Sequence, residues 1–341
     1  MLRLEKLNVA IIGLGVGERH LRGYQDDPRV SIVKLCDFNK EKVKEIKKKY
    51  PDYQTINDPN EILEDSKIDV ISIASYDNFH SKQVINAIQN GKHVFVEKPI
   101  CLFEEELENI VETLNKFPNS KLSSNFVLRR APQFEKLKNM INGDSFGEIY
   151  YLEGDYNYGR VHKLIDGWRG QIPFYSVMHG GGIHIIDLLT WLSKNRVIEV
   201  IGIGNKKVTK KSNFKNFDFV TSLLKFENEI IGKVSANFGS VTPHFHKISL
   251  YGTKATFFNE YENSIIFKER ENENNKEVFD NKFDNSKKAN VLKSFISSIL
   301  ENQKPDVTAQ EVIDIMSISL AIEKSLTSKK WEPVKYYKLY K

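Results

Sequence analysis

Two short apolar runs joined by one helical pattern constrain the fold of this chain most strongly. The runs are Val70–Ala74 and Val94–Val96, and the helical pattern His80–Asn90 between them stops at Gly91. Two buried strands linked by a helix form a βαβ unit with parallel strands. The second run ends in Glu97–Pro99. A lysine there is poorly suited to core packing and well placed for chemistry, because open α/β sheets bind ligands at the carboxyl ends of their strands.

The same alternation runs through the first 124 residues. Further strands are expected at Asn8–Gly13, Val30–Cys36 and Leu122–Asn125, with helices at Lys40–Tyr50 and Glu104–Lys116. Alternating strands and helices predict an α/β domain with a doubly wound parallel sheet, here residues 1–124.

The pattern changes in residues 125–341, which we expect to form a second domain. Strand-like segments predominate, and several are joined by short turns. They predict a large, mainly antiparallel sheet in an α+β domain. The strands are expected at Glu148–Tyr158, Val197–Ile203, Phe217–Phe226, Ile230–Phe238, Phe245–Tyr251, Ala255–Phe258 and Ser264–Phe267, a hairpin tip at Asn272–Lys276, and helices at Ala131–Asn142, His184–Leu192, Lys288–Glu301 and Thr308–Lys324.

Composition excludes several classes of protein. Of the 341 residues, 40% are hydrophobic and 28% charged, which is ordinary for a globular chain. The net charge of +5 comes from scattered lysine clusters rather than a single stripe, which argues against nucleic-acid binding. The only cysteines are Cys36 and Cys101, so no zinc or other metal site is expected. With no membrane-length apolar run and no signal-peptide pattern, we expect a cytoplasmic protein.

A glycine turn follows the first strand. Gly13, Gly15 and Gly17 allow close backbone approach to a pyrophosphate at the start of a helix. The spacing is G-x-G-x-G, one residue shorter than the usual G-x-G-x-x-G, with Glu18 at the third-glycine position. An ordinary strand-to-helix turn is the alternative.

Asp37 ends the second strand, 20 residues after Gly17. A carboxylate there can accept hydrogen bonds from both ribose hydroxyls of NAD and would repel the 2′-phosphate of NADP. NAD is therefore expected over NADP, although Lys40 would soften the repulsion. A helix-capping role for Asp37 is the alternative.

A third group of candidate residues begins the apolar helix of the second half. Gly180–Gly182 precede His184, and Asp187 lies three residues further on, so both side chains share one helix face. A structural histidine is the alternative, and His179 is a weaker candidate.

Taken in order, these features resemble the Gfo/Idh/MocA oxidoreductase family, named for glucose-fructose oxidoreductase and inositol dehydrogenase. The resemblance rests on GLGVG, Asp37, the Glu97–Pro99 tripeptide preceded by GKHV, and GGGIHIID at Gly180–Asp187. It implies a Rossmann domain, a second domain built on an open-faced sheet, a substrate site between them, and a homodimer or homotetramer formed through that sheet.

The resemblance also implies residue roles. Lys98 would be the catalytic lysine and His184 the catalytic histidine, and Asp187 would orient His184 or touch substrate hydroxyls. The implied cofactor set is Gly13, Gly15, Val16, Gly17, Asp37, Ser75, His80, Glu97 and Lys98.

One departure from the family pattern affects the proton chemistry. Many members carry an aspartate four residues before the histidine, where this chain has Gly180. Lys98 and His184 would then share proton transfer while hydride passes to the nicotinamide. Lys98 could also donate to the developing alkoxide.

A dense polar and aromatic stretch lies between the strand at Glu148–Tyr158 and the glycines. Aromatic faces suit the C–H surfaces of a sugar, and arginine or lysine suits a phosphate or carboxylate. A tyrosine-rich strand at a subunit interface is the alternative. The expected substrate residues are Lys98, Tyr156, Arg160, Trp168, Arg169, His184 and Asp187.

The sequence therefore favours an NAD(P)-dependent dehydrogenase or reductase acting on the CH–OH or keto carbon of a sugar or cyclitol, including a nucleotide-linked sugar. Two alternatives remain: an NAD-dependent glycosidase-like enzyme that oxidises the sugar transiently, and a non-catalytic dinucleotide-binding sensor.

Overall fold

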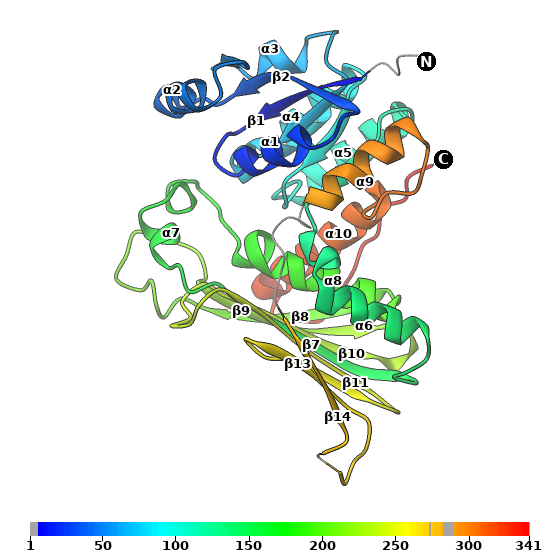
Figure 1. Ribbon diagram of the computed structural model, residues 1–341. Helices are drawn as coiled ribbons and strands as arrows, with labels where there is room; N and C mark the ends of the chain where they lie inside the picture. Colours follow the sequence, from blue (N-terminus) through cyan, green and yellow to red (C-terminus); the bar gives the residue numbers. More distant parts are fainter. Residues whose placement is uncertain (1–5, 273, 282–288, 341) are drawn as a thin grey trace. The chain divides into compact units, whose positions relative to one another are not determined.

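The computed structural model describes residues 6–272, 274–281 and 289–340. By their internal contacts, the residues fall into two compact units (Figure 1). Unit 1 comprises Met1–Phe126, Asn285–Asp314 and Tyr337–Lys341, and unit 2 comprises Val127–Asp284 and Ile315–Tyr336. The chain therefore returns to unit 1 after it has built most of unit 2.

Unit 1 contains a six-stranded parallel sheet in the order β3-β2-β1-β4-β5-β6. The order reverses between β1 and β4, and such a reversal marks the ligand-binding edge of a doubly wound sheet. The expected Rossmann architecture is confirmed. Its elements are β1 (Leu7–Ile12), α1 (Gly17–Gln25), β2 (Val30–Cys36), α2 (Lys40–Lys49), β3 (Gln54–Ile56), α3 (Asn60–Leu63), β4 (Val70–Ile73), α4 (Asp77–Gln89), β5 (His93–Val96), α5 (Glu104–Lys116) and β6 (Leu122–Ser124).

Central strands β4 and β5 supply the apolar core of this sheet. Every residue of β4 is buried, as are Val94, Phe95 and Val96 of β5. Strands covered by helices on both faces read as continuous apolar runs, which explains why the sequence pattern identified them. Gly91 ends the turn after α4 with φ +73°, a conformation that glycine adopts without steric cost.

Helix α9 (Asn290–Leu300) belongs to unit 1 although it follows nearly all of unit 2. Phe295 packs on Phe95 of β5 with ring centroids 5.7 Å apart. A Cβ on Gly23 of α1 would lie 2.7 Å from Leu292, so this glycine lets the two helices approach closely. The sequence predicted one domain boundary, at residue 124, and did not predict that the chain returns to unit 1.

Unit 2 is built on a nine-stranded sheet in the order β14-β13-β12-β11-β7-β10-β9-β8-β15. Strands β7 and β10 pair in parallel, and the other neighbours are antiparallel. The expectation of a large, mainly antiparallel sheet is confirmed. Its strands are β7 (Ile149–Asn157), β8 (Val197–Asn205), β9 (Phe219–Phe226), β10 (Ile231–Asn237), β11 (Phe245–Gly252), β12 (Thr256–Asn259), β13 (Asn263–Phe267), β14 (Lys276–Asp280) and β15 (Glu332–Pro333).

Helices α6 and α8 lie on one face of this sheet (Figure 1). A Cβ on Gly154 of β7 would lie 2.5 Å from Ile185 of α8, so strand and helix are in close contact. On the opposite face, Ile203, Leu223 and Ile231 are exposed. The helical elements of unit 2 are η1 (Val127–Arg130), α6 (Pro132–Asn142), α7 (His162–Ile165), η2 (Trp168–Gly170), the π-helix η3 (Met178–Gly182), α8 (Ile183–Ser193), η4 (Glu227–Glu229) and the end of α10 (Ala309–Ser328).

Three further observations concern the chain as a whole. The expected hairpin tip at Asn272–Lys276 includes residue 273, which lies outside the described residues; β13 and β14 pair on either side of it. Among the described residues, no helix combines the length and apolar character that a membrane span requires. The same residues contain no cluster of three His, Cys, Asp or Glu side chains able to hold a metal ion.

Candidate functional site

The three glycines of the turn between β1 and α1 have different surroundings. Gly13 has φ +88°, and a Cβ there would lie 2.3 Å from the carbonyl oxygen of Ala74 at the end of β4. Gly17 begins α1, and its Cβ would lie 2.9 Å from Ile11. A Cβ on Gly15 would meet no protein atom within 4 Å. The turn therefore keeps an open position at Gly15, as close approach of a pyrophosphate requires.

Glu18, at the position of the missing third glycine, is held by cations. Its carboxylate is bonded by Arg22, Lys49 and the hydroxyl of Tyr50. The hydrogen bond from Lys49 is the largest influence, and it outweighs partial burial to lower the pKa of Glu18 to about 2. The negative charge beside the turn is thus compensated by cations of the protein. The close contact between α1 and β1 is made at Gly17 instead of at position 18.

Asp37 joins the first two βα connections. Its Oδ2 accepts from the backbone N–H of Leu14 at 2.8 Å, and its Oδ1 accepts from that of Asn39 at 2.9 Å. The side chain is buried. Each carboxylate oxygen can accept a second hydrogen bond, so Asp37 can hold the glycine turn and still receive a ribose hydroxyl.

Lys98 is half-buried and follows the end of β5, and its peptide bond to Pro99 is cis. The preceding Glu97 accepts from Asn125 Nδ2 at 2.6 Å and lies 3.0 Å from His20 Nε2. Burial alone would raise the pKa of Glu97, but His20, Lys98 and Asn125 lower it to about 2. Lys98 therefore stands beside an ionised carboxylate that neighbouring elements hold in place.

His80 of α4 is fully buried and connects the segments that follow β4 and β5. Its Nδ1 lies 2.6 Å from the carbonyl oxygen of Pro99, and its Nε2 lies 3.0 Å from that of Ser75. Both ring nitrogens thus lie within hydrogen-bonding distance of backbone carbonyl oxygens. The contacts place His80 as a support for the Lys98–Pro99 segment, while Ser75 Oγ donates to Gln83 at 2.6 Å.

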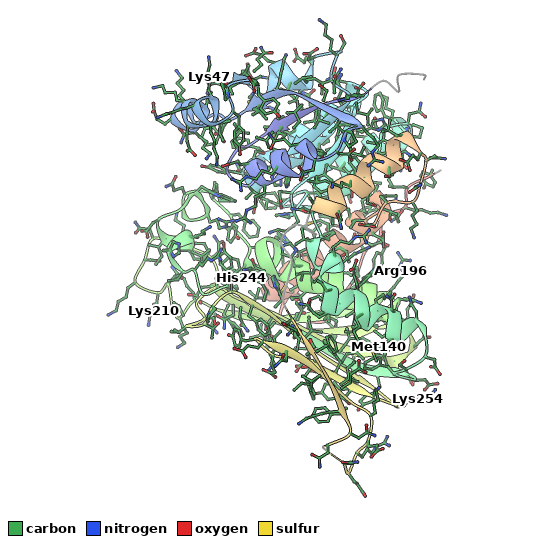
Figure 2. All side chains as sticks on the ribbon, in the orientation of Figure 1. Lys47, Met140, Arg196, Lys210, His244 and Lys254 are labelled. Carbon is green, nitrogen blue, oxygen red and sulfur yellow. The ribbon has the colours of Figure 1, made fainter. Side chains whose placement is uncertain are left out.

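In unit 2, His184 of α8 lies against the aromatic side chains of the sheet. Its ring stacks on Tyr156 of β7 with centroids 6.0 Å apart and makes an edge contact with His246 of β11 at 6.1 Å. His246 is paired in register with Tyr156, and His244, labelled in Figure 2, lies 4.6 Å from His246. Helix α8, strand β7 and the start of β11 therefore bring three histidines and a tyrosine together.

Asp187, one turn further along α8, is fully buried and bonded to an arginine. The guanidinium of Arg129 donates to Asp187 Oδ1 through Nη2 at 2.7 Å and through Nε at 3.1 Å. Both side chains are almost inaccessible to solvent. A buried carboxylate needs such a partner, and this pair ties α8 to the segment that begins unit 2.

The missing aspartate at position 180 has a steric explanation. A Cβ on Gly180 would lie 2.0 Å from the hydroxyl oxygen of Tyr175. Tyr175 is buried, and its hydroxyl accepts from Arg169 Nε at 3.0 Å. The place that a side chain at position 180 would need is therefore filled by the Tyr175–Arg169 pair.

The remaining substrate candidates of the sequence lie around these aromatic rings. Arg160 lies over the ring of Tyr158 at 5.1 Å, and Tyr158 stacks on Tyr156 with centroids 5.6 Å apart. Arg169 lies over the ring of Trp168 at 4.6 Å. The structure thus brings Tyr156, Arg160, Trp168, Arg169 and His184 into one connected region of unit 2.

Sequence reasoning missed several residues of both units. His20 and Asn125 bind Glu97, Arg129 binds Asp187, and Tyr175 fills the space beside Gly180. His20 belongs to the GLGVGERH segment and could have been noticed there. The other three carry no local pattern, because their partners come from other elements.

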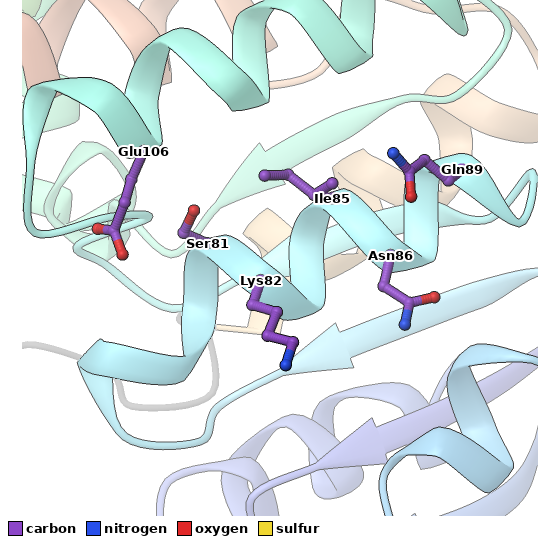
Figure 3. Close-up of a pocket in the computed structure, with 6 residues that line it drawn as sticks. All are labelled: Ser81, Lys82, Ile85, Asn86, Gln89 and Glu106. Atoms are coloured by element: carbon purple, nitrogen blue, oxygen red, sulfur yellow. The ribbon is translucent and has the colours of Figure 1, made fainter.

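A separate pocket lies on the helical surface of unit 1 (Figure 3). It is lined by Ser81, Lys82, Ile85, Asn86 and Gln89 of α4 and by Glu106 of α5. None of these residues belongs to the expected cofactor, catalytic or substrate sets. We assign this pocket no part in the chemistry.

Comparison with family models gives two matches. Residues 7–125 match the oxidoreductase family with an NAD-binding Rossmann fold, and residues 134–258 match the GFO/IDH/MocA C-terminal domain. The expected cofactor, NAD, agrees with the description of that Rossmann family.

Comparison with individual proteins also finds oxidoreductases. The chain is 23% identical over 337 residues to myo-inositol 2-dehydrogenase of Thermotoga maritima, covering 95% of this chain and 97% of that one. It is 30% identical to D-glucoside 3-dehydrogenase of Escherichia coli, covering 69% of this chain and 68% of the relative.

A solved levoglucosan dehydrogenase in complex with NADH and L-sorbose superposes with a TM-score of 0.87 at 19% identity, covering 97% of this chain and 99% of the other. This likeness confirms the fold. The matches to both family domains and to the glucoside dehydrogenase show that the chain is a member of the Gfo/Idh/MocA family of NAD-binding oxidoreductases.

Proposed function

We propose that this protein uses NAD to oxidise a CH–OH carbon of a sugar or cyclitol, or catalyses the reverse reduction. The observation that carries the proposal is the placement of Lys98 at the carboxyl end of β5, beside the ionised and buried Glu97. The names of its relatives support the substrate class, because they include dehydrogenases of inositols, a glucoside and levoglucosan.

The cofactor would be held by unit 1. The residues Gly13, Gly15, Val16 and Gly17 would surround its pyrophosphate, and Asp37 would accept from its adenosine ribose. Glu97, Lys98 and the Ser75 segment would lie near its nicotinamide end, with His80 supporting their backbone. When bound, NAD supplies a nicotinamide carbon that accepts the hydride.

Lys98 and His184 would move the proton. Oxidation breaks the C–H and O–H bonds of the carbinol, so a base must take the hydroxyl proton as the carbonyl forms. An ammonium at Lys98 would stabilise the alkoxide in either direction. Tyr156, Arg160, Trp168 and Arg169 would bind the sugar in unit 2. Asp187 would hold His184 in position through the helix that the two residues share, with Arg129 fixing the carboxylate.

The test is Lys98→Ala. We expect turnover to fall by about 10²-fold or more, since a positioned proton-transfer group typically contributes 10²–10⁴-fold. NADH binding, followed by fluorescence titration, should persist. Lys82→Ala, which removes an exposed lysine of α4, is the matched control and should turn over normally. Wild-type turnover by Lys98→Ala would refute the assignment.

A second candidate is a glycosidase-like reaction in which retained NAD oxidises and then re-reduces one sugar carbon. One relative is named glycosyl hydrolase family 109 protein, from Porphyromonas gingivalis; it is 26% identical and covers 74% of this chain and 59% of the relative. Sugar release without net change in nicotinamide absorbance would favour this reaction over a dehydrogenase.

We further propose that the protein is a homodimer or homotetramer of the cytoplasm. The uncovered face of the nine-stranded sheet exposes Ile203, Leu223 and Ile231, and such apolar faces favour association. Cys36 and Cys101 are both buried and form no disulfide, as expected of a reducing compartment.

A further inference from the structure

The segment between β7 and the π-helix concentrates positive charge beside stacked aromatic rings. It carries Arg160, Lys163 and Arg169, together with His162 and a single carboxylate, Asp166. In the part of the chain that the structure describes, neither Arg160 nor Lys163 forms an ion pair, and Asp166 bonds to none of the three cations. Charges on a solvated surface usually find partners or spread apart. Here three cations lie within one short segment, and Arg160 lies 5.1 Å from the centre of the Tyr158 ring.

The pKa of Tyr158 shows the effect of these cations. Its ring is buried between Tyr156 and Phe238, whose centroids lie 5.6 Å and 4.7 Å away. Burial alone would raise the pKa of Tyr158, but the positive charges of Arg169, Lys163 and Arg160 outweigh it and lower the pKa. All three cations thus act at one point, which is the electrostatic environment that favours an anion.

The two guanidinium groups are also oriented. Arg160 lies over Tyr158, and Arg169 lies over Trp168 while its Nε donates to Tyr175. A stacked guanidinium loses less conformational freedom when it binds, and its planar fork matches the oxygens of a phosphate or carboxylate. The aromatic stack continues from Tyr158 through Tyr156 to His184.

We propose that Arg160, Lys163 and Arg169 bind an anionic group of the substrate, so that the protein acts on a phosphorylated, carboxylated or nucleotide-linked sugar rather than a neutral one. This inference rests on the proposed function, because it places the anionic group in the substrate site that contains His184. The aromatic faces of Tyr156 and Tyr158 would contact the sugar ring. Charge at one end and stacking along the ring would together fix which carbon is presented for oxidation.

The test measures binding by calorimetry to NADH-loaded protein. The probes are D-glucose, D-glucose 6-phosphate, D-glucuronate and UDP-glucose. We expect at least one anionic sugar to bind about tenfold more tightly than glucose, corresponding to about 1.4 kcal/mol. This advantage should shrink as salt screens the charges. The 6-phosphate, carboxylate and diphosphate probes distinguish the three possible anions.

Two double variants complete the experiment. Arg160→Gln with Lys163→Gln should lower the ratio of anionic to neutral affinity about tenfold or more. Lys254→Gln with Lys268→Gln removes two charges elsewhere on unit 2 and should keep the wild-type ratio; Lys254 is labelled in Figure 2. Circular dichroism would establish that both variants fold.

Glucose binding as tightly as every anionic sugar would overturn the inference, as would an unchanged ratio in the Arg160/Lys163 variant or no binding of any anionic sugar. Failure to bind NADH would instead count against the proposed function. The anion-binding inference and the proposed function can therefore fail separately.

Discussion

Among the glycines of the turn between β1 and α1, Gly15 differs from its neighbours because its missing side chain leaves space that no protein atom uses. Gly13 has a left-handed backbone and its Cβ would meet Ala74, whereas a Cβ on Gly15 would meet nothing within 4 Å. Protein packing therefore explains glycine at position 13 and not at position 15. The proposed pyrophosphate site gives a reason for Gly15 that protein packing does not.

This difference gives a prediction. Gly15→Ala should keep the wild-type free energy of unfolding within about 0.5 kcal/mol, because it creates no clash. Its affinity for NADH should fall about tenfold or more, since the methyl group would occupy the place proposed for the pyrophosphate. Gly13→Ala should instead lose about 1–3 kcal/mol of stability through backbone strain and contact with Ala74. Urea unfolding and NADH titration measure both quantities, and unchanged NADH affinity in Gly15→Ala would contradict the proposed cofactor site.

Local motifs were enough to single out Lys98, Asp37 and His184 as candidates, because each follows a strand end or begins a helix. Their supporting partners could not be predicted in this way. His20 is separated from Glu97 by 77 residues, and Arg129 is separated from Asp187 by 58. Such pairs are brought together by the fold, and one sequence contains no pattern that reports them.

At the scale of elements, polar side chains join helix α10 to the segment that leads into the π-helix η3. Ser176 bonds the carboxyl group of Glu323, and the hydroxyl of Ser319 lies 2.7 Å from His179 Nδ1. Burial raises the pKa of Glu323 from 4.5 to about 7, against the smaller opposite effect of Ser176. Helix α10 therefore carries a carboxyl group that the fold holds in its neutral form in weak acid.

The consequence for stability has a definite sign. Well below pH 4.5 Glu323 is protonated in both the folded and the unfolded chain. As the pH rises to about 7, the unfolded chain loses this proton first, so the free energy of unfolding falls, by at most about 3 kcal/mol. Glu323→Gln should remove this part of the pH dependence. Urea unfolding between about pH 5 and about pH 8 measures it, with Glu105→Gln, at an exposed residue of α5, as the control. Identical slopes for wild type and Glu323→Gln would disprove the assignment.

Periodicity predicted the long helices and most strands, because buried strands and amphipathic helices leave patterns over neighbouring residues. It did not predict strand β14 or the parallel pairing of β10 with β7. Pairing depends on which edges meet in space. The π-helix also escaped prediction, since its widened turn depends on packing of the glycines at positions 180–182 rather than on hydrophobic spacing.

For the whole molecule, the open face of the nine-stranded sheet predicts self-association. Ile203 is 71% exposed and Leu223 is 45% exposed, each on the face that carries no helix. Ile203→Glu with Leu223→Glu should shift the protein from an oligomer to a monomer, because charges would be buried at the interface. Light scattering after size-exclusion chromatography measures the mass. Val241→Glu, at an exposed apolar residue outside the strands, should keep the wild-type mass. A monomeric wild-type protein would contradict the proposal.

The route of the chain has a consequence for protein synthesis. Helix α9 supplies Phe295 and Leu292 to the core of unit 1, yet the ribosome makes it only after residues 127–284 of unit 2. Domains commonly fold in the order in which they emerge. Here the strands of the Rossmann sheet are synthesised first, but helix α9, which covers apolar surface beside β5 and α1, is synthesised near the end. This surface is therefore covered only after most of the chain has been made. The nascent protein thus has a long interval in which this surface is open to chaperones and to misfolding.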